Sequence, residues 1–399
     1  MTKHFKEALR RHGLPKICIA IGNLLLNLFA RIIGKTIRYS RRVKLPSFYE
    51  ARQTLERYHS VPESSTSSLK MSKNILYDVT IIVPCYNVEQ YIQQCIDSLK
   101  SLSFREKLEV ILVNDGSTDG TLSIIESNKF PDSWTLINQS NSGLAVARNK
   151  GIAASHGQYL TFVDSDDIID SEGLQTLWMA ARENDLDLVD GSIVRLENPN
   201  QYLYRYKKYV ANVKNEPVPI SVSGMAMGRL YRRDLWKNVR FPESFWYEDT
   251  AILYLIFPRV VRYGTIPDVT YHYRYNPNGQ SKSVKNSRVI DTVYIIPKLL
   301  KLASDMGVDL GRVRTLTRWQ ESRFVYERVS PLGDDSLLQA AFVCAMESYR
   351  AYYSTCPGDQ DSKLLRMICT SFLSKDYELW RFSSRILLLK DQLRRLSVS

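Results

Sequence analysis

Three carboxylates fall within four positions at Asp164, Asp166 and Asp167, directly after an apolar run at residues 159–163. Carboxylate oxygens this close together repel one another unless a cation lies among them. Hard divalent cations prefer oxygen ligands and often complete their coordination with substrate phosphates. The pattern therefore indicates a site for a metal-bound nucleotide diphosphate. The alternative is a solvated acidic turn that caps the next helix, for which Asp170 and Ser171 are also available.

Three other residues could contact a nucleotide. Asp115 follows a second apolar run and could accept a hydrogen bond from a base or ribose, and Tyr86 could stack on a nucleobase. Arg148 lies about one helical turn beyond Gly143, where it could reach a diphosphate whose charge is also favoured at a helix N-terminus. Each has a plainer interpretation, because Asp115 and Tyr86 could be turn residues and Arg148 could form a surface salt bridge.

A second acidic pair, Glu248 and Asp249, precedes an apolar run and follows three aromatic residues. One of its carboxylates could deprotonate an acceptor hydroxyl, a role that is worth roughly 10²–10⁴-fold in rate. Acidic residues are also common at helix N-termini without any catalytic role. Further along, His272 lies between two tyrosines on a strand-like run, where it could be a third metal ligand, contact phosphates or be structural.

The elements that position these residues alternate between strand and helix from residue 78 onward. This alternation predicts an α/β fold with a largely parallel sheet covered by helices. Ligands of such sheets bind outside the carboxyl ends of the strands, which is where Tyr86, Asp115 and Asp164 fall. We predict strands at residues 79–83, 108–113, 134–138, 159–163 and 269–275, and helices at residues 89–102, 121–127, 143–154, 224–239 and 250–262.

The 399 residues divide into three parts by charge and periodicity. Residues 1–77 hold a net charge of +11, residues 78–285 hold −3 and residues 286–399 hold +4. We therefore predict a basic N-terminal segment (1–77), a central α/β domain (78–285) and a helical C-terminal region (286–399) that could support a homo-oligomer or a complex. No recognition-helix, zinc-finger or RNP pattern accompanies the basic charge, so we do not expect nucleic-acid binding.

The N-terminal segment contains an apolar run at residues 17–33, which Asn23, Asn27 and Arg31 interrupt. The run is shorter than the ~20 apolar residues that a spanning helix needs, and no small-residue cleavage site follows it. Its polar residues recur every four positions, which predicts an amphipathic helix with basic flanks. Such a helix suits an anionic membrane surface, or else packs on the domain or on a partner subunit. Together with cysteines at no metal-ligand spacing, this predicts a cytoplasmic protein held peripherally on the inner face of the cell membrane.

Five motifs, taken in order, resemble the family 2 glycosyltransferases with the GT-A fold, especially those of bacterial capsule, exopolysaccharide and teichoic-acid synthesis. The motifs are VTIIVPCYNVEQYIQQCIDSL, VILVNDGSTDGT, NSGLAVARNKGI, YLTFVDSDD and YEDTAILY, and they lie between residues 78 and 285. The resemblance implies a Rossmann-like, nucleotide-diphospho-sugar transferase domain. It also implies inverting transfer of a hexosyl or N-acetylhexosaminyl group from a nucleotide-sugar, expected to be a UDP-sugar, to a cell-surface glycan or lipid-linked acceptor.

The resemblance further implies which residues bind the nucleotide. Pro84, Tyr86 and Glu89 would line the nucleoside pocket. Asp115 would contact the base, and Asp164 would touch the ribose or the diphosphate.

Metal binding and catalysis are implied in the same way. Asp166 would bind the metal, Mn²⁺ or Mg²⁺, with His272 as the candidate for a further ligand. Asp249 would be the catalytic base, and Glu248 would support it or hold the acceptor. Arg148 and the metal would stabilise the charge that builds on the leaving diphosphate.

Signatures of other enzyme classes are missing from the sequence, and this narrows the expected activity. No Gln-x-x-Arg-Trp signature of processive polymer synthases follows Glu248 and Asp249, and no set of membrane spans for a secretion channel is visible, so we expect single-sugar transfer. No Gly-x-Gly-x-x-Gly follows the first strand, which disfavours a Rossmann oxidoreductase or a nucleotidyltransferase. The alternative that stays open is a non-catalytic scaffold subunit of a glycan-synthesis complex, which would bind nucleotide-sugar without turnover.

Overall fold

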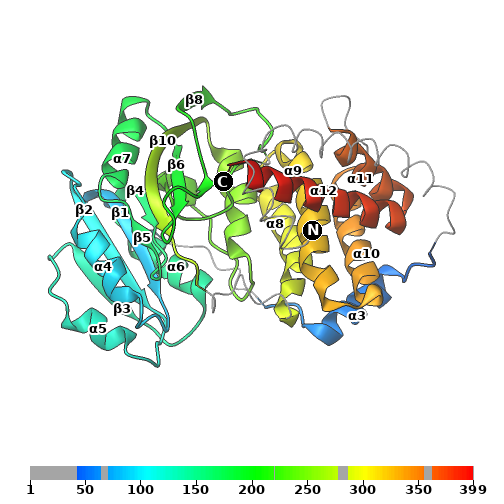
Figure 1. Cartoon of the computed structure of the whole chain (residues 1–399), viewed down its shortest axis with the longest axis horizontal. Coiled ribbons are helices and arrows are strands. Elements are labelled where there is room, and N and C mark those ends of the chain that lie inside the picture. The colour runs from blue at the N-terminus through cyan, green and yellow to red at the C-terminus, as the bar shows by residue number, and fades with distance from the viewer. Residues whose placement is uncertain (1–42, 64–70, 220, 277–285, 355–361, 399) are drawn as a thin grey trace, which may run out of the picture. The chain divides into compact units, whose positions relative to one another are not determined.

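The computed structural model describes residues 43–63, 71–219, 221–276, 286–354 and 362–398 (Figure 1). The amphipathic helix predicted at residues 17–33 lies outside this range. The described residues form two compact units. Residues 61–283 and 297–313 make up one of them, the α/β unit, and residues 1–60, 284–296 and 314–399 make up the other, the helical unit.

A ten-stranded sheet forms the centre of the α/β unit. Its main order is β3-β2-β1-β4-β9-β6-β10-β5, while β7 pairs with β6 and β8 pairs with β10. The strands are β1 (Tyr77–Cys85), β2 (Leu108–Asn114), β3 (Trp134–Asn138), β4 (Gly157–Phe162), β5 (Ile168–Ile169), β6 (Leu188–Arg195), β7 (Tyr202–Tyr204), β8 (Tyr209–Asn212), β9 (Arg229–Arg232) and β10 (Arg262–Tyr273).

The predicted α/β fold is confirmed, but the sheet is mixed rather than largely parallel. β1, β2, β3 and β4 run parallel, as do β6 and β10, whereas β9 is antiparallel to both β4 and β6. The helix predicted at residues 224–239 is wrong, because β9 fills the gap between the two parallel groups. Arg229, Leu230 and Tyr231 are all buried, so this segment has no solvent-facing side and sheet pairing overrides the helical spacing.

Helices cover both faces of the sheet (Figure 1). They are α4 (Ile92–Lys100), α5 (Thr121–Ser127), α6 (Leu144–Ala154) and α7 (Gly173–Glu183). Val79, Ile81 and Val83 of β1 point to one face, where they join the core that contains α4 residues. Ile82 points to the other face, which α6 covers. The helix lies so close to the strand that a Cβ atom added to Gly151 would be only 2.3 Å from the Ile82 Cγ2 atom. The β-branched run of β1 is thus buried on both sides, as its composition requires.

Short helical turns replace the helix predicted at residues 250–262. The chain passes through 3-10 turns at Glu248–Thr250 and Phe257–Arg259, with a π-helical turn at Ile252–Ile256 between them. Every residue of this π-helical turn is buried. Pro258 lacks the N–H that a continuing α-helix would need, and the last turn ends at Arg259.

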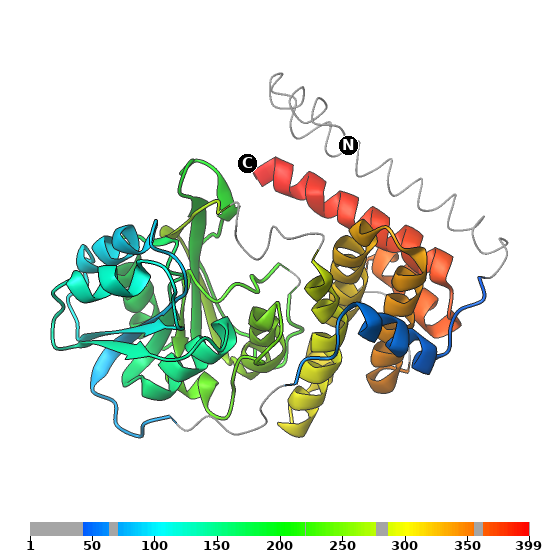
Figure 2. The same ribbon diagram turned by 90° about the horizontal axis from the view of Figure 1, so that it is seen from below.

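The helical unit is built from α3 (Phe48–Tyr58), α9 (Arg314–Val329), α10 (Asp335–Tyr352), α11 (Lys363–Ser374) and α12 (Tyr377–Val398), while α8 (Asp291–Asp305) begins in this unit. α3 packs along α10 (Figure 2). The Asp334 carboxylate accepts from two backbone N–H groups at the start of α10, and the Tyr58 hydroxyl of α3 donates to it at 2.5 Å. Within the described part of the chain, no helix is long and apolar enough to cross a bilayer.

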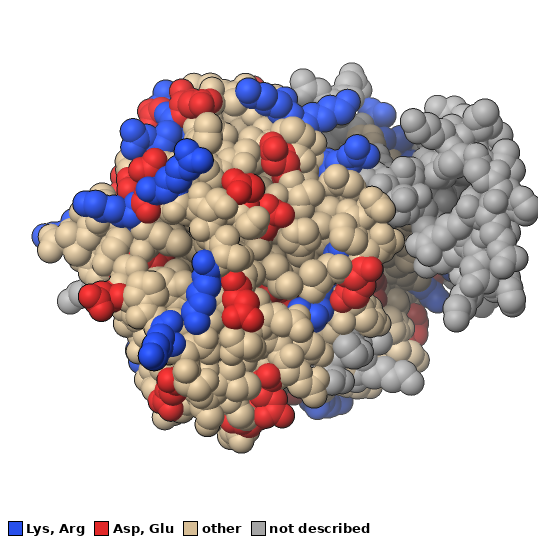
Figure 3. All heavy atoms as spheres, turned by 60° about the vertical axis from the view of Figure 1, so that its left-hand side comes forward, with Lys and Arg blue, Asp and Glu red and all other residues tan. Residues whose placement is uncertain are grey.

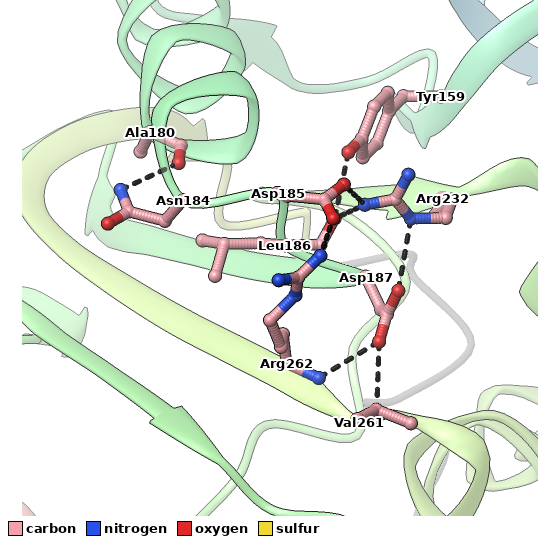
Figure 4. Close-up of polar contacts among 9 residues, drawn as sticks. All are labelled: Tyr159, Ala180, Asn184, Asp185, Leu186, Asp187, Arg232, Val261 and Arg262. Atoms are coloured by element: carbon pink, nitrogen blue, oxygen red, sulfur yellow. Dashed lines mark hydrogen bonds and ion pairs between the residues drawn. The ribbon is translucent and has the colours of Figure 1, made fainter.

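An ion-pair cluster closes the amino ends of β6 and β10 (Figure 4). The Asp187 carboxylate pairs with Arg232 at 3.0 Å and accepts from the backbone N–H groups of Val261 and Arg262 at 2.9 Å each. Asp185 pairs with both arginines. Because this cluster lies at the opposite end of the strands from Asp115 and Asp164, it is part of the scaffold.

Candidate active site at the carboxyl ends of the strands

Three strand ends bring the predicted nucleotide residues to one edge of the sheet. β1 and β2 pair in parallel up to Cys85 and Asn114, and β1 pairs in parallel with β4 up to Phe162. Tyr86, Asp115 and Asp164 follow these ends within a few residues, so they lie on the same side of the sheet.

The acidic run after β4 makes contacts that differ from residue to residue. The Asp164 carboxylate faces Arg148. Asp166 accepts from the Asn276 side-chain amide at 2.9 Å, and Asp167 accepts from the Tyr271 hydroxyl at 2.7 Å. Burial first, and Asp164 second, raise the pKa of both Asp166 and Asp167. Crowded, partly desolvated carboxylates of this kind are stabilised by a cation.

The interpretation of this run as a helix cap does not describe the structure. The residue that supports the start of α7 is Asp170, whose Oδ1 atom accepts from the backbone N–H groups of Glu172 at 3.0 Å and Gly173 at 3.1 Å. Asp164 and Asp166 make no such contact among the described residues. They therefore take no part in the start of α7.

Arg148 of α6 joins the two acidic groups of the site. Its guanidinium donates to Asp164 at 2.7 Å and to Glu248 at 2.6 Å, and only 3% of its side chain is exposed. Burial alone would lower the pKa of Arg148, but the two carboxylates outweigh burial and raise it above its ordinary value. Arg148 thus forms buried ion pairs and not a surface salt bridge. Its positive charge is already shared between two carboxylates.

The next residue of α6, Asn149, holds the segment that leads to Glu248. Its side-chain amide donates to the Phe241 carbonyl at 2.9 Å and accepts from the Phe241 N–H at 2.8 Å. It also donates to the Glu243 carboxylate at 3.1 Å. Two adjacent residues of one helix therefore fix both ends of the loop between Phe241 and Glu248.

Glu248 and Asp249 are presented by a strained turn. Tyr247 has φ 66° and ψ 32°, a left-handed conformation that is uncommon for a bulky residue. Glu248 is buried, and its pKa is raised, mainly by burial and also by Asp249, although Arg148 opposes the rise. Asp249 is only partly buried, so it is the more accessible carboxylate of the pair.

The loops after β1 and β2, which hold the predicted nucleoside residues, are tied to each other. Tyr86 is 46% exposed, which leaves its ring free to be covered. The Glu89 carboxylate accepts from the Gly120 N–H at 2.7 Å, and the Asn87 side chain accepts from the Thr118 N–H at 2.8 Å. Pro84 is buried near the end of β1, directly before the loop that contains Tyr86. Glu89 thus has a structural partner in the neighbouring loop.

Asp115 orders the turn that begins α6. Its Oδ1 atom accepts from the Gln139 amide at 2.7 Å and from the Ser142 N–H at 2.8 Å, and its Oδ2 atom accepts from the Gly143 N–H at 2.8 Å. Gly143 has φ 94°, a conformation that favours glycine. A carboxylate offers about four lone-pair positions, so three contacts leave room for one more donor.

His272 is held away from the acidic run. Its Nε2 atom lies 3.0 Å from the Asp170 carboxylate. Its neighbour Tyr271 points to Asp167, and successive side chains of a strand point to opposite faces. The structure therefore brings His272 together with Asp170 and not with Asp166.

The segment after His272 closes over the acidic run. The Arg274 N–H donates to Asp167 at 2.7 Å, and its guanidinium donates to the Asp166 carbonyl at 2.6 Å and to Gln94 at 2.6 Å. Sequence reasoning missed Asn149 and Tyr271 as site residues. Asn149 directly follows Arg148 in the motif NSGLAVARNKGI, which was the available signal, whereas nothing local distinguishes Tyr271 from the other tyrosines.

The donor set fits a hard divalent cation only in part. Asp164 and Asp166 offer carboxylate oxygens, but no group of three or more His, Cys, Asp or Glu side chains within the described ranges is arranged to hold a metal. Oxygens from a bound diphosphate would have to complete the coordination, as is common for Mg²⁺.

Comparison with known proteins finds a family model that matches part of the chain. Residues 80–239 match the model of "Glycosyl transferase family 2". The uncharacterized glycosyltransferase EpsJ of Bacillus subtilis (strain 168) is 36% identical over 214 residues, which cover 50% of this chain and 62% of EpsJ. The minor teichoic acid biosynthesis protein GgaB of the same organism is 29% identical over 220 residues, which cover 52% of this chain and 24% of GgaB. The chain thus spans less than two thirds of either relative.

A solved structure supports the fold. The crystal structure of S. aureus TarS 1-349 in complex with UDP-GlcNAc has a TM-score of 0.53 and 19% sequence identity, and the match covers 77% of this chain and 90% of that chain. The predicted family resemblance and the predicted GT-A-like α/β domain followed by helices are confirmed.

We predict that removal of the Arg148 charge destabilises the α/β unit. Arg148→Met leaves two carboxylates without their cation in a buried place, so the free energy of unfolding should fall by about 3–5 kcal/mol. Urea denaturation measures the change. The control is Lys301→Met in the same unit, because the Lys301–Asp305 pair is 71% and 56% exposed, and exposed pairs contribute about 0–1 kcal/mol. Equal losses in the two variants would contradict a special role for Arg148.

Proposed function

We infer the activity of this chain from one premise. Residues 80–239 belong to the family 2 glycosyltransferases. The finer proposal is an inverting, metal-dependent transfer of one hexosyl or N-acetylhexosaminyl group from a UDP-sugar to a cell-surface glycan or lipid-linked acceptor. The observation that carries it is the convergence of Asp164, Asp166 and the Glu248–Asp249 pair at one strand edge, with Arg148 between them. The UDP-GlcNAc bound by TarS supports the choice of donor class.

The nucleoside would lie over the loops after β1 and β2. Tyr86 is exposed and has a free ring face for a base to stack on. We propose that Asp115 uses its remaining lone pair for a base N–H, while its other contacts keep the turn at Gly143 in place. Pro84 and Glu89 would shape the pocket, Glu89 through its contact with Gly120.

The diphosphate would lie at the end of β4. We propose that Asp166, with Asp164 beside it, binds Mn²⁺ or Mg²⁺ together with diphosphate oxygens. The metal would neutralise charge on the departing diphosphate. His272 is not included in this proposal, because its side chain contacts Asp170, whereas Tyr271 on the opposite face of β10 is the residue that contacts the acidic run. Arg148 is assigned to positioning Asp164 and Glu248, since its Nη2 and Nη1 atoms donate to these two carboxylates.

The transfer step requires a base on the acceptor side. We propose that Asp249 takes the proton of the acceptor hydroxyl as its oxygen attacks the anomeric carbon opposite the leaving diphosphate. Glu248 is buried and paired with Arg148, so it would fix the turn that presents Asp249. In this arrangement one oxygen–carbon bond forms while the bond to the leaving diphosphate breaks, which inverts the anomeric centre.

We predict that Asp249→Asn impairs the transfer step, whereas Asp166→Asn impairs metal-dependent binding of the donor. With UDP-GlcNAc as the first donor in a panel and Mn²⁺ present, Asp249→Asn should lower kcat by about 10²–10⁴-fold and leave donor binding intact, because only the base is lost. Asp166→Asn should weaken Mn²⁺-dependent protection by the donor against thermal unfolding. Donor hydrolysis and thermal shifts measure the two effects.

Asp170→Asn is the matched control for this pair of variants. Asp170 follows the same acidic run after the short strand β5, but it contacts His272 and the start of α7, so turnover should change little. Turnover that survives Asp166→Asn would contradict the metal assignment. Donor binding without turnover in the unaltered protein would favour the non-catalytic scaffold instead.

We propose that the basic N-terminal segment holds the protein on the inner face of the cell membrane. Residues 1–42 contain ten Lys and Arg and one Glu, and each Lys or Arg near an anionic surface contributes about 1 kcal/mol. A variant that lacks residues 1–42 keeps α3 and should lose most of its binding to phosphatidylglycerol vesicles in sedimentation. Phosphatidylcholine vesicles are the control. Unchanged binding of the shortened variant to anionic vesicles would overturn this placement.

A further inference from the structure

One tyrosine of β10 contacts two members of the acidic run that follows β4. The Tyr271 hydroxyl donates to the Asp167 carboxylate at 2.7 Å, and its oxygen accepts from the Asp164 N–H at 3.0 Å. Only 1% of Tyr271 is exposed. A hydroxyl has one hydrogen to donate and can also accept, so this single group uses both capacities on residues of the acidic run.

The acidic run needs such support because it lies outside the sheet. β4 ends at Phe162 and β5 begins at Ile168, while β9, β6 and β10 lie between these two strands in the sheet order. Within the run, the Asp167 N–H donates to the Asp164 carbonyl at 3.0 Å, which closes a turn. The position of this turn relative to the sheet therefore depends on contacts that other elements make with it.

Asp167 attaches the turn to β10 through both of its carboxylate oxygens. Its Oδ2 atom accepts from the Tyr271 hydroxyl, and its Oδ1 atom accepts from the Arg274 N–H at 2.7 Å. Basic and acidic side chains are interspersed over the surface drawn in Figure 3, but only 1% of Asp167 is exposed. A buried carboxylate that loses a donor is costly, because water cannot replace that donor. Asp167 is thus an anchor, and Asp166, the proposed metal ligand, directly precedes it.

The Tyr271 ring is itself held in place by the sheet. Tyr271 pairs with Ile169 of β5 and with Ile193 of β6, and all three side chains belong to one buried core cluster. A tyrosine side chain has only two rotatable bonds that move its ring, so packing on both sides leaves the hydroxyl little freedom. The hydroxyl is therefore a fixed point against which the acidic run is set.

A second tyrosine of β10 makes the same type of contact away from the acidic run. Tyr263 lies near the amino end of β10, is 5% exposed and donates to the buried Asp190 carboxylate at 2.7 Å. Asp190 also pairs with Arg229, and neither residue belongs to the candidate active site. The contact by itself is thus part of the scaffold, so a functional role for Tyr271 depends on its position beside Asp166.

We propose that Tyr271 is a positioning residue for the divalent cation, an inference that rests on the proposed function. Its hydroxyl fixes residues 164 and 167, and Asp166 lies between them, so these positions are held as one group. A divalent cation requires its oxygen ligands at well-defined distances and angles. Groups that hold metal ligands in place typically contribute about 10–100-fold to metal affinity. Tyr271 acts in this way without touching the metal itself.

The test compares Tyr271→Phe with Tyr263→Phe in the full chain. Each variant loses one buried hydroxyl that donates to an aspartate at 2.7 Å, so both should lose similar amounts of stability in urea. Equilibrium dialysis measures Mn²⁺ binding in the presence of UDP. Tyr271→Phe should bind Mn²⁺ about 10–100-fold more weakly, whereas Tyr263→Phe should bind it like the unaltered protein.

Donor hydrolysis provides a second measurement. In Tyr271→Phe the Mn²⁺ concentration for half-maximal rate should rise by the same factor as in dialysis. The rate should recover at saturating Mn²⁺, because the metal ligands and the proposed base are still present.

Asp167→Asn tests the same contact if Tyr271→Phe does not fold, because it leaves the tyrosine ring in the core. Its control is Asp170→Asn, which removes an equal charge close to the same run. Asp167→Asn should weaken Mn²⁺ binding more than this control does.

The outcomes separate this inference from the proposed function. Equal Mn²⁺ affinities in Tyr271→Phe and Tyr263→Phe, or equal affinities in Asp167→Asn and Asp170→Asn, would overturn the role of Tyr271 and leave the proposed function standing. If the unaltered protein binds no Mn²⁺ in the presence of UDP, the proposed metal dependence fails, and the role of Tyr271 fails with it.

Discussion

The site depends on one buried cation that is shared by two carboxylates. Arg148 belongs to α6, Asp164 follows β4, and Glu248 lies in a turn far along the chain. Placing three charges in a desolvated setting is costly, and it is tolerated only because each charge meets its opposite at hydrogen-bonding distance. This contact fixes the separation between the acidic run and the Glu248–Asp249 turn. A donor and an acceptor that react with each other need such a fixed separation.

The fold supplies this contact through a few rigid attachments. Gly151 lets α6 approach β1 closely, which sets the height of Arg148 above the sheet. Asn149 clamps Phe241 and so delivers Glu248 to the same helix. On the other side, Tyr271 donates to Asp167, and its hydroxyl oxygen accepts from the Asp164 N–H at 3.0 Å. The strand ends, one helix and β10 therefore converge on Asp164, Asp167 and Glu248.

Much of this arrangement could be predicted from the sequence, but its central contact could not. Local periodicity located β1, β2, β3 and β4, and parallel strand ends placed Tyr86, Asp115 and Asp164 together. Periodicity failed at β9, because a segment buried between two strand groups has no polar side to reveal its type. Arg148 and Glu248 lie 100 positions apart, so their pairing follows from tertiary packing alone. His272 was proposed as a metal ligand from its residue type, and its contact with Asp170 arises from tertiary packing across 102 positions of the chain.

The most direct test of this account is a double-mutant cycle on kcat/KM for donor turnover with Arg148→Met and Glu248→Gln. If Arg148 positions the Glu248–Asp249 turn, the two changes act on one interaction, so the double variant should be no slower than the worse single variant. If Arg148 instead acts on the diphosphate independently of Glu248, the losses should multiply. Multiplying losses would contradict the claim that this shared cation organises the active site.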